Sequence, residues 1–283
     1  TRNRLENGTP RTQYWGVDSE YGALRDVLIG PAQHYQWQTG NAIARRSLRR
    51  GLKFDSAAAS AQYNELVDAF RGAGVTVHQL GADAALPYQL YARDSSVRTP
   101  WGALITQTFS PWRRGEWRAV VDFYLHHDIP IYDVITAGSL EGGDLMFLKP
   151  GLVVCGCSGE RTDRRGLEQL EGWIRAEGWE FISYEFDPFY LHLDVKLGML
   201  EKNLAVVCKD ALEPNFVQLL IDRGIELIDI SLPAALDLGC NVVALGNERI
   251  ITPSHNTELI DKCRSIGLQV LDPNFRFLRN VFL

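Results

Sequence analysis

Two carboxylates stand in an unusual place, in the stretch 139–144 of sequence SLEGGD. The flanking segments Ile129–Val134 and Leu145–Leu148 are apolar and typical of buried strands. Glu141 and Asp144 are therefore expected where strands meet, and there they need a cationic or hydrogen-bonding partner, because burying an unpaired charge is costly. The glycine pair between them lets another backbone or a ligand come close. A solvated turn, in which glycine and aspartate are common, is the alternative.

The elements that must position these carboxylates follow a repeated pattern. Each repeat has a short apolar strand, an amphipathic helix, a tight turn and a second strand. The expected helices are Ala57–Arg71, Glu116–His127, Gly166–Ala176, Pro214–Arg223 and Thr257–Ile266. The strands expected before them are Leu24–Ile29, Ala103–Thr106, Leu152–Cys155, Leu204–Val207 and Val242–Leu245. Four helices are followed by a glycine, which favours the left-handed C-terminal cap, and the second helix is followed by Asp128.

Polar motifs recur at equivalent positions, after the second strand of successive repeats. They are YARD at 91–94, EGGD at 141–144, LHLD at 191–194 and LGCN at 238–241. Repeats of roughly 40 to 55 residues are typical of propellers and solenoids, and five such units can close into a ring without exposed sheet edges. We therefore expect residues 1–283 to form a single α/β domain, a propeller with a central cavity. The residues expected to converge on this cavity are Asp94, Glu141, Asp144, His192, Asp194 and Cys240.

Several carboxylates and one imidazole around a cavity favour a planar, permanently cationic ligand. A guanidinium fits this description, because it presents five N–H groups that carboxylates bind two at a time. Histidine is suited to protonate a leaving amine and then to activate water. A thiolate beside a cation and a histidine would be the natural nucleophile.

Four motifs, in order, resemble those of the guanidino-group-modifying enzymes: YARD at 91–94, LEGGD at 140–144, GERT at 159–162 and LHLD at 191–194. This superfamily comprises arginine deiminases, dimethylarginine dimethylaminohydrolases and amidinotransferases. The resemblance covers nearly the whole chain. It implies the pentein fold, a five-bladed, pseudo-symmetric α/β propeller of repeated β-α-β units around a central cavity.

The resemblance also implies roles for individual residues. Glu141 and His192 would be the catalytic acid–base pair. Asp94 and Asp194 would bind the substrate guanidinium, and Asp144 would support the same site. Arg161 would hold a substrate carboxylate.

The nucleophile departs from the family pattern. In this superfamily the catalytic cysteine lies near the C-terminus in a glycine-rich segment, whereas residues 272–283 contain neither glycine nor cysteine. Cys240 is a weak candidate, because it lies in a segment that opens the fifth repeat, upstream of the family nucleophile; a packed thiol is the alternative. Three interpretations stay open: a truncated or altered end, a protein that binds without catalysing, or another thiol in the role. A start at Thr1 instead of methionine and the atypical end favour the first.

Composition limits the classes of partner. The formal net charge of -6 argues against a general nucleic-acid binder, and the basic run RRSLRR at 45–50 is interpreted as a solvated helix face. The chain has no apolar run of about 18 residues and no basic-then-apolar leader, so no membrane segment is expected. Five cysteines, an odd number, fit a reducing compartment better than a disulfide framework, and we expect a cytoplasmic protein.

Neither a cofactor nor a metal is expected. The chain has no phosphate-binding glycine loop, and the spacing of Cys155 and Cys157 is wrong for a zinc site. The segment WRRG at 112–115 is interpreted as a connector. The expected partner is a small guanidino or amidino compound, and a homo-oligomer is compatible with the sequence.

The sequence thus predicts a hydrolase acting on the guanidino or amidino C–N bond of arginine or a related compound, through a covalent amidino-cysteine. Two alternatives remain. An amidinotransferase would pass the amidino group to an amine instead of water, and a non-catalytic protein would only bind guanidino compounds.

Overall fold

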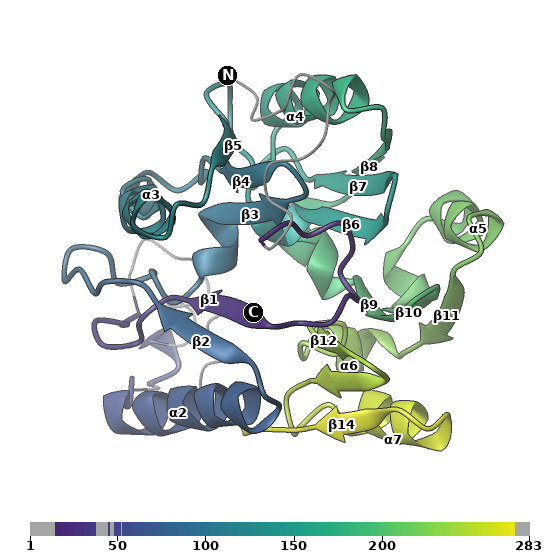
Figure 1. Ribbon diagram of the computed structural model, residues 1–283. Coiled ribbons are helices and arrows are strands. Elements are labelled where there is room, and N and C mark those ends of the chain that lie inside the picture. Colours follow the sequence, from purple (N-terminus) through teal and green to yellow (C-terminus); the bar gives the residue numbers. More distant parts are fainter. Residues whose placement is uncertain (1–14, 38–44, 46–47, 52, 275–283) are drawn as a thin grey trace. The chain divides into compact units, whose positions relative to one another are not determined.

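The computed structural model describes residues 15–37, 45, 48–51 and 53–274 (Figure 1). The chain divides into two compact units. Unit 1 comprises Thr1–Gly22 and Tyr91–Asp194, and unit 2 comprises Ala23–Leu90 and Val195–Leu283. Part of the basic run at 45–50 and residues 275–283 of the C-terminal segment lie outside the described residues.

Unit 1 contains two three-stranded sheets of the same topology. The first has the order β3-β4-β5 and the second the order β6-β7-β8. Their strands are β3 (Ser96–Thr99), β4 (Gly102–Ile105), β5 (Ile131–Val134), β6 (Leu145–Lys149), β7 (Leu152–Cys157) and β8 (Glu180–Glu185). In each sheet the first two strands are antiparallel and the last two are parallel. The parallel pairs are connected by α3 (Trp117–His126) and α4 (Arg164–Ala176).

Unit 2 repeats this topology. Its three-stranded sheets have the orders β9-β10-β11 and β12-β13-β14, and a further sheet pairs β1 with β2 in parallel. The strands are β1 (Asp26–Ile29), β2 (Thr76–Gln79), β9 (Leu197–Glu201), β10 (Leu204–Val207), β11 (Glu226–Asp229), β12 (Val243–Gly246), β13 (Arg249–Ile251) and β14 (Gln269–Leu271). The helices are α2 (Ser56–Gly72), α5 (Pro214–Asp222), α6 (Leu232–Ala235) and α7 (Thr257–Ser265).

The five predicted β-α-β repeats are therefore confirmed, and the five expected helices agree with α2, α3, α4, α5 and α7. The fifth repeat differs from the prediction in one respect. The strand before its helix is β13, whereas the expected strand at 242–245 corresponds to β12 and pairs antiparallel with β13. The hairpin forms because Gly246, Asn247 and Glu248 adopt φ values of 74°, 54° and 60°, and a strand of three residues is too short to give a clear periodic signal.

The helix ends agree with the expected caps. Gly74, Gly178, Gly224 and Gly267 have φ values of 84°, 81°, 76° and 92°. Asp128 takes the same left-handed conformation after α3, with φ 52°, which aspartate tolerates better than most residues. Each parallel strand therefore starts from a similar turn.

The core of unit 1 fixes the segment that carries the glycine pair. Leu140 and Leu145, on either side of Glu141–Asp144, are completely buried in one hydrophobic cluster with Phe147 of β6 and Leu170 of α4. Leu140 also joins an isolated antiparallel bridge with Gln107. Glu141 and Asp144 are thus carried into the interior by apolar neighbours, as their flanking sequence indicates.

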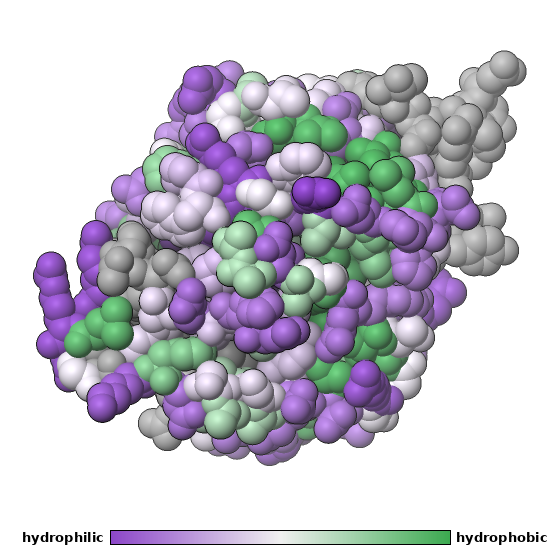
Figure 2. Space-filling view, turned by 90° about the vertical axis from the view of Figure 1, so that its left-hand side faces the viewer, coloured by the Kyte–Doolittle hydropathy of each residue, from purple (hydrophilic) through white to green (hydrophobic). Residues whose placement is uncertain are grey.

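Among the described residues, no helix combines the length and apolar character needed to cross a bilayer. On the face seen in Figure 2, hydrophobic residues are interspersed with hydrophilic ones.

Candidate active site

Short 3-10 turns deliver three of the predicted carboxylates. One turn spans Ala92–Asp94 before β3, and another spans Gly142–Asp144 before β6. A third, Leu193–Val195, contains Asp194 and precedes β9. The recurrence of one turn at equivalent positions of successive repeats explains why the polar motifs have similar spacing.

His192 is the centre of the cluster in unit 1. Its Nδ1 lies 3.2 Å from Asp144 Oδ2, and its Nε2 lies 3.4 Å from Glu141 Oε2 and 3.8 Å from Asp94 Oδ1. The side chain is only 8% exposed. Burial disfavours the charged imidazole, but Asp144 and then Asp94 outweigh it and raise the pKa of His192 to about 10. His192 is therefore protonated at neutral pH and offers an N–H from each ring nitrogen.

The glycine pair is required by close packing. A Cβ on Gly142 would lie 1.9 Å from the Arg93 carbonyl oxygen, and one on Gly143 would lie 2.8 Å from Cγ of His192. Any larger residue at either position would push apart two of the segments that form the site. This confirms the expectation of close approach and explains why the segment is not an ordinary solvated turn.

The backbone before His192 is strained. Leu191 has φ 64° and ψ -68°, and the His192 amide donates to the Tyr190 carbonyl oxygen at 2.7 Å. This is the rare form of γ-turn, which is unfavourable for a residue with a side chain. Beyond the turn, the Leu193 amide donates to Asp144 Oδ1 at 2.9 Å. The turn and this hydrogen bond together orient the imidazole toward the carboxylates.

Asp94 is paired with a cation that the sequence interpretation missed. Arg113 Nη1 donates to Asp94 Oδ2 at 2.9 Å, and Arg113 Nη2 donates to Glu116 Oε2 at 2.9 Å. The three side chains are 6%, 12% and 2% exposed for Arg113, Asp94 and Glu116. Burial alone favours the neutral acid, but Arg113 and then His192 outweigh it and lower the pKa of Asp94 to about 2. Asp94 is therefore ionised at neutral pH.

The segment 112–115 does connect β4 to α3, but Arg113 within it is buried, although its neighbour Arg114 is exposed. The helix expected from residue 116 starts at Trp117, and Glu116 turns inward before it. One signal was available: Arg113 and Glu116 have the i, i+3 spacing of an ion pair. Nothing in that spacing indicates that the pair contacts Asp94.

Glu141 is completely buried and has three partners. Oε1 accepts from the Phe109 amide at 2.8 Å, while Oε2 lies 3.4 Å from both Arg161 Nη1 and His192 Nε2. Burial, followed by the charge of Asp94, raises the pKa of Glu141 above its usual value. Arg161 is thus placed beside a predicted catalytic carboxylate.

Asp194 lies at the more open side of the cluster. Arg93 Nε is 3.7 Å from Asp194 Oδ2, and Arg93 Nη1 is 3.6 Å from Glu20 Oε2. Burial raises the pKa of Asp194 to about 6, against the opposing charges of His192 and Arg93. Arg93 and Glu20 are further charged residues that the sequence interpretation did not assign to the site.

The six residues predicted to form the site all belong to unit 1 and share this network: Asp94, Glu141, Asp144, Arg161, His192 and Asp194. The expected convergence of the motifs at 91–94, 141–144 and 191–194 is therefore observed. Cys240 belongs to unit 2 and is buried.

Unit 1 provides two thiols among its described residues, Cys155 and Cys157, and both are free and buried. Burial, followed by the charge of Asp144, raises the pKa of Cys155 well above that of an ordinary thiol. Since the thiolate is the nucleophilic form, Cys155 is not activated for attack.

The cluster also contains three side chains of the types that bind metal ions. Atoms of Asp94, Glu141 and His192 that resemble metal ligands lie within 4.8 Å of one another. However, Arg113 and Arg161 already contact the two carboxylates, and His192 is protonated. A metal ion would require removal of the imidazole proton and displacement of two cations.

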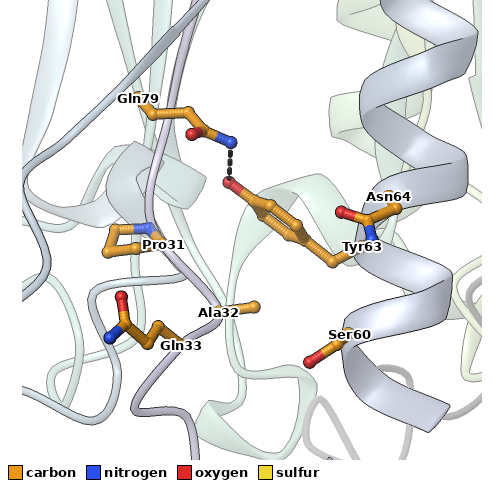
Figure 3. A pocket seen from close by; sticks show the side chains of 7 residues that line it. All are labelled: Pro31, Ala32, Gln33, Ser60, Tyr63, Asn64 and Gln79. Atoms are coloured by element: carbon orange, nitrogen blue, oxygen red, sulfur yellow. Dashed lines mark hydrogen bonds between the residues drawn. The ribbon is translucent and has the colours of Figure 1, made fainter. Parts of the chain in front are cut away.

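A separate hollow lies in unit 2, beside α2 and the ends of β1 and β2 (Figure 3). Its lining is uncharged and consists of Pro31, Ala32, Gln33, Ser60, Tyr63, Asn64 and Gln79. The Gln79 amide donates to the Tyr63 hydroxyl at 3.1 Å across one side of it. None of the predicted site residues lines this hollow, so the ionisable cluster of unit 1 is the stronger candidate for chemistry.

The amino-acid sequence is similar to that of known proteins. The sequence model of the family described as "N,N dimethylarginine dimethylhydrolase, eukaryotic" matches residues 35–263. The chain belongs to this family. It is also 25% identical over 238 residues to the N(G),N(G)-dimethylarginine dimethylaminohydrolase of Pseudomonas aeruginosa, an alignment that covers 80% of this chain and 88% of the relative.

Solved structures show the same fold. A cysteine-to-serine variant of the Pseudomonas aeruginosa enzyme, complexed with citrulline, gives a TM-score of 0.76 at 20% identity and covers 92% of this chain and 96% of that one. The N-terminal domain of ArgZ, a cyanobacterial arginine dihydrolase bound to product, gives 0.79 at 17% identity, covering 92% and 94%. SxtG, an amidinotransferase from Microseira wollei, gives 0.75 at 14% identity, covering 94% and 93%.

Two predictions are thereby confirmed: membership of the guanidino-group-modifying superfamily and the pentein fold. The family and the Pseudomonas aeruginosa relative also agree with the predicted class of enzyme, a hydrolase acting on guanidino groups.

Proposed function

We propose that the protein hydrolyses the guanidino C–N bond of arginine or an N-substituted arginine, giving a ureido compound and an amine. The observation that carries this proposal is the arrangement around His192. A protonated imidazole lies 3.4 Å from Glu141 and 3.8 Å from Asp94, and all three groups are buried. An acid beside carboxylates that can bind a guanidinium is the combination that expulsion of an amine requires.

Three of the four predicted carboxylates already contact a guanidinium of the chain itself. Arg113 binds Asp94, Arg161 binds Glu141 and Arg93 binds Asp194. The site is therefore electrostatically suited to guanidinium groups, and a substrate must compete with these contacts. Arg161 is easier to displace than Arg113, because its contact is 3.4 Å long and its side chain is 20% exposed, against 2.9 Å and 6% for Arg113. The contact of Arg93 with Asp194 is longer still, at 3.7 Å.

Displacement of Arg161 gives it a new role. When the substrate guanidinium takes its place beside Glu141, Arg161 becomes available for an anionic group on the substrate. Arginine supplies both of these charges, so its guanidinium can pair with Glu141 while its carboxylate pairs with Arg161, and neither side chain is left as an unpaired charge. We therefore assign Arg161 to the substrate carboxylate, and Asp94 and Asp194 to the guanidinium.

The proposed reaction has two steps. A thiolate attacks the guanidinium carbon, His192 donates a proton to the departing amine, and an amidino-cysteine forms. The imidazole then takes one proton from a water molecule as the water oxygen adds to the same carbon. The thiolate leaves, and the second proton of that water passes through solvent to the released amine, giving the ureido product and an ammonium ion. Glu141 stabilises the cationic carbon and assists proton transfer, while Asp144 holds the imidazole.

The thiol of this reaction is assigned by experiment. Incubation with 2-chloroacetamidine, an amidine that alkylates reactive thiols, followed by peptide mass spectrometry, identifies the labelled cysteine. Cys240 is the candidate from the sequence, and protection of the labelled residue by arginine supports the proposal. If arginine does not slow the labelling, the labelled thiol is not the nucleophile of this reaction.

Product analysis tests the reaction itself. Purified protein is incubated with arginine and with N-methylated arginines, and citrulline and released amines are quantified. Glu141→Gln should abolish turnover while the fold is kept. Glu160→Gln, an exposed carboxylate in the same unit, should leave turnover unchanged. Equal turnover in the two variants would refute the role of Glu141.

Amidino transfer is the second candidate, since SxtG, which shares the fold, is an amidinotransferase. Adding glycine or another primary amine distinguishes the two reactions, because transfer gives a new guanidino compound in place of citrulline. Arginine that raises the melting temperature without forming either product would identify a guanidino-compound binder. We further propose that residues 1–283 form a single catalytic domain. We also propose a cytoplasmic protein, since none of the five cysteines forms a disulfide.

A further inference from the structure

Thr162 connects two carboxylate-bearing residues of the site. The side chain is completely buried. Its Oγ1 accepts a hydrogen bond from the Glu141 amide at 3.2 Å and donates to Asp144 Oδ2 at 2.7 Å. The Thr162 carbonyl oxygen in turn accepts from the Gly159 amide at 3.0 Å, which closes the turn that contains Arg161.

The direction of these hydrogen bonds is fixed by chemistry. A backbone N–H only donates, whereas a hydroxyl has one proton to give and lone pairs to accept with. The Thr162 hydroxyl must therefore give its proton to Asp144. The Thr162 hydroxyl is thus held in one orientation, and its two hydrogen bonds connect the Glu141 backbone with the Asp144 side chain.

Asp144 depends on this hydroxyl for its own orientation. Its Oδ1 accepts from the Leu193 amide at 2.9 Å, and its Oδ2 is shared between Thr162 at 2.7 Å and His192 Nδ1 at 3.2 Å. The two shorter contacts come from Leu193 and Thr162. These two donors thus fix the plane of the Asp144 carboxylate. The carboxylate in turn fixes the orientation of the imidazole, because its Oδ2 contacts Nδ1 of His192.

We propose that Thr162 is a positioning residue: its hydroxyl holds Asp144 in the plane that orients His192 between Glu141 and Asp94. The consequence for catalysis rests on the proposed function, because only there does His192 act as an acid. The predicted effect on the orientation of the imidazole does not depend on the proposed function, because it follows from the geometry of the protein alone.

The test compares three substitutions. Thr162→Val keeps the shape and removes the hydroxyl, and Thr162→Ser keeps the hydroxyl and removes a methyl group. Thr136→Val is the control, because Thr136 is an exposed threonine of the same unit. The readout is the pKa of His192, from NMR titration of protein labelled in the histidine rings, with the resonance assigned by its loss in His192→Asn.

In Thr162→Val the carboxylate is free to turn away from the ring, so the pKa of His192 should fall by about one unit or more, that is tenfold or more in the protonation constant. Asp94 and Glu141 lie near Nε2 of His192 and still raise its pKa in this variant. Thr162→Ser and Thr136→Val should stay within about 0.3 unit of the natural protein. Turnover should fall roughly 10- to 100-fold in kcat in Thr162→Val, with KM little changed, as loss of a well-placed acid predicts.

An unchanged or raised pKa in folded Thr162→Val would overturn the proposal, because an Asp144 that stays in place and loses a competing donor binds the imidazolium at least as strongly. If Thr162→Val does not fold, Thr162→Cys replaces it, since a thiol is a weaker hydrogen-bonding group. The pKa of His192 in Thr162→Cys must then lie below the values of both Thr162→Ser and the natural protein. A lowered pKa in a protein that forms no product from any guanidino substrate would refute the proposed function and leave the positioning role intact.

Discussion

Arg113→Met should destabilise the protein strongly, because it leaves the buried carboxylates of Asp94 and Glu116 without their cation. Arg113 is 6% exposed and makes 2.9 Å contacts with both carboxylates. Methionine has a similar unbranched stem, so the substitution removes mainly the charge and its hydrogen bonds. The adjacent Arg114 is exposed, and Arg114→Met is therefore a matched control in the same segment.

The size of the effect follows from burial. Removing one partner of a buried ion pair typically costs about 3–5 kcal/mol, whereas an exposed pair contributes about 0–1 kcal/mol. Arg113→Met should thus lower the free energy of unfolding by about 3 kcal/mol or more. Burial already raises the pKa of Glu116, so protonation of Glu116 in the variant relieves part of the cost. Arg114→Met should change the free energy by no more than about 0.5 kcal/mol.

The pH dependence gives a second signature. The pKa of Asp94 is lowered to about 2 in the folded protein, so its ionisation contributes stability that is present above the unfolded pKa near 3.9 and is lost as the pH falls toward 2. In Arg113→Met the pKa of Asp94 rises and this contribution becomes smaller, because only His192 and Arg161 then lower that pKa. The difference between the two proteins should therefore be largest near pH 7 and shrink below pH 4.

Urea unfolding at several pH values, followed by tryptophan fluorescence and circular dichroism, measures both effects. Adding Glu116→Gln to Arg113→Met tests the coupling: the double variant should lose less than the sum of the two single losses, because both changes break one network. Arg113→Met and Arg114→Met with equal, small effects would refute the assignment of a buried ion-pair network.

Three further predictions concern the site. Arginine should bind more tightly as the pH rises from 5 to 7, because the pKa of Asp194 is raised to about 6 and only its ionised form pairs with a guanidinium; calorimetry should show a weaker pH dependence in Asp194→Asn, and an identical dependence would contradict this role. Leu191→Gly should be more stable than Leu191→Ala by about 1 kcal/mol, since glycine adopts φ 64° without strain. Leu191→Gly should nevertheless have the lower kcat, because the backbone then holds His192 less firmly. The reverse order of stability would exclude the strained turn. Gly143→Ala should reduce turnover and shift the NMR resonances of the His192 ring, because the new Cβ lies 2.8 Å from the ring. The control is Gly172→Ala in α4, where the space around the new Cβ is open. This substitution should be neutral or should stabilise the protein by up to about 1 kcal/mol.

Much of the fold is local and was readable from the sequence. The helices were predicted to within two residues at each end because their amphipathic period and their glycine caps are properties of short segments. The hairpin of β12 and β13 was missed, because its turn and short strand give a weak local signal. The functional motifs were found because they recur at equivalent positions of a repeat, which requires no knowledge of contacts.

The sequence by itself determined the repeats, the caps and the identity of the acidic and imidazole groups, since residue type and spacing are enough to define them. Only the tertiary structure decided how those groups are paired. Arg113 and Asp94 are 19 residues apart, and their contact depends on how β3, β4 and the start of α3 pack. The protonation of His192 likewise depends on three carboxylates from different segments meeting in a buried space, because electrostatic interactions act through distance and burial, and neither is encoded in any single stretch of the chain.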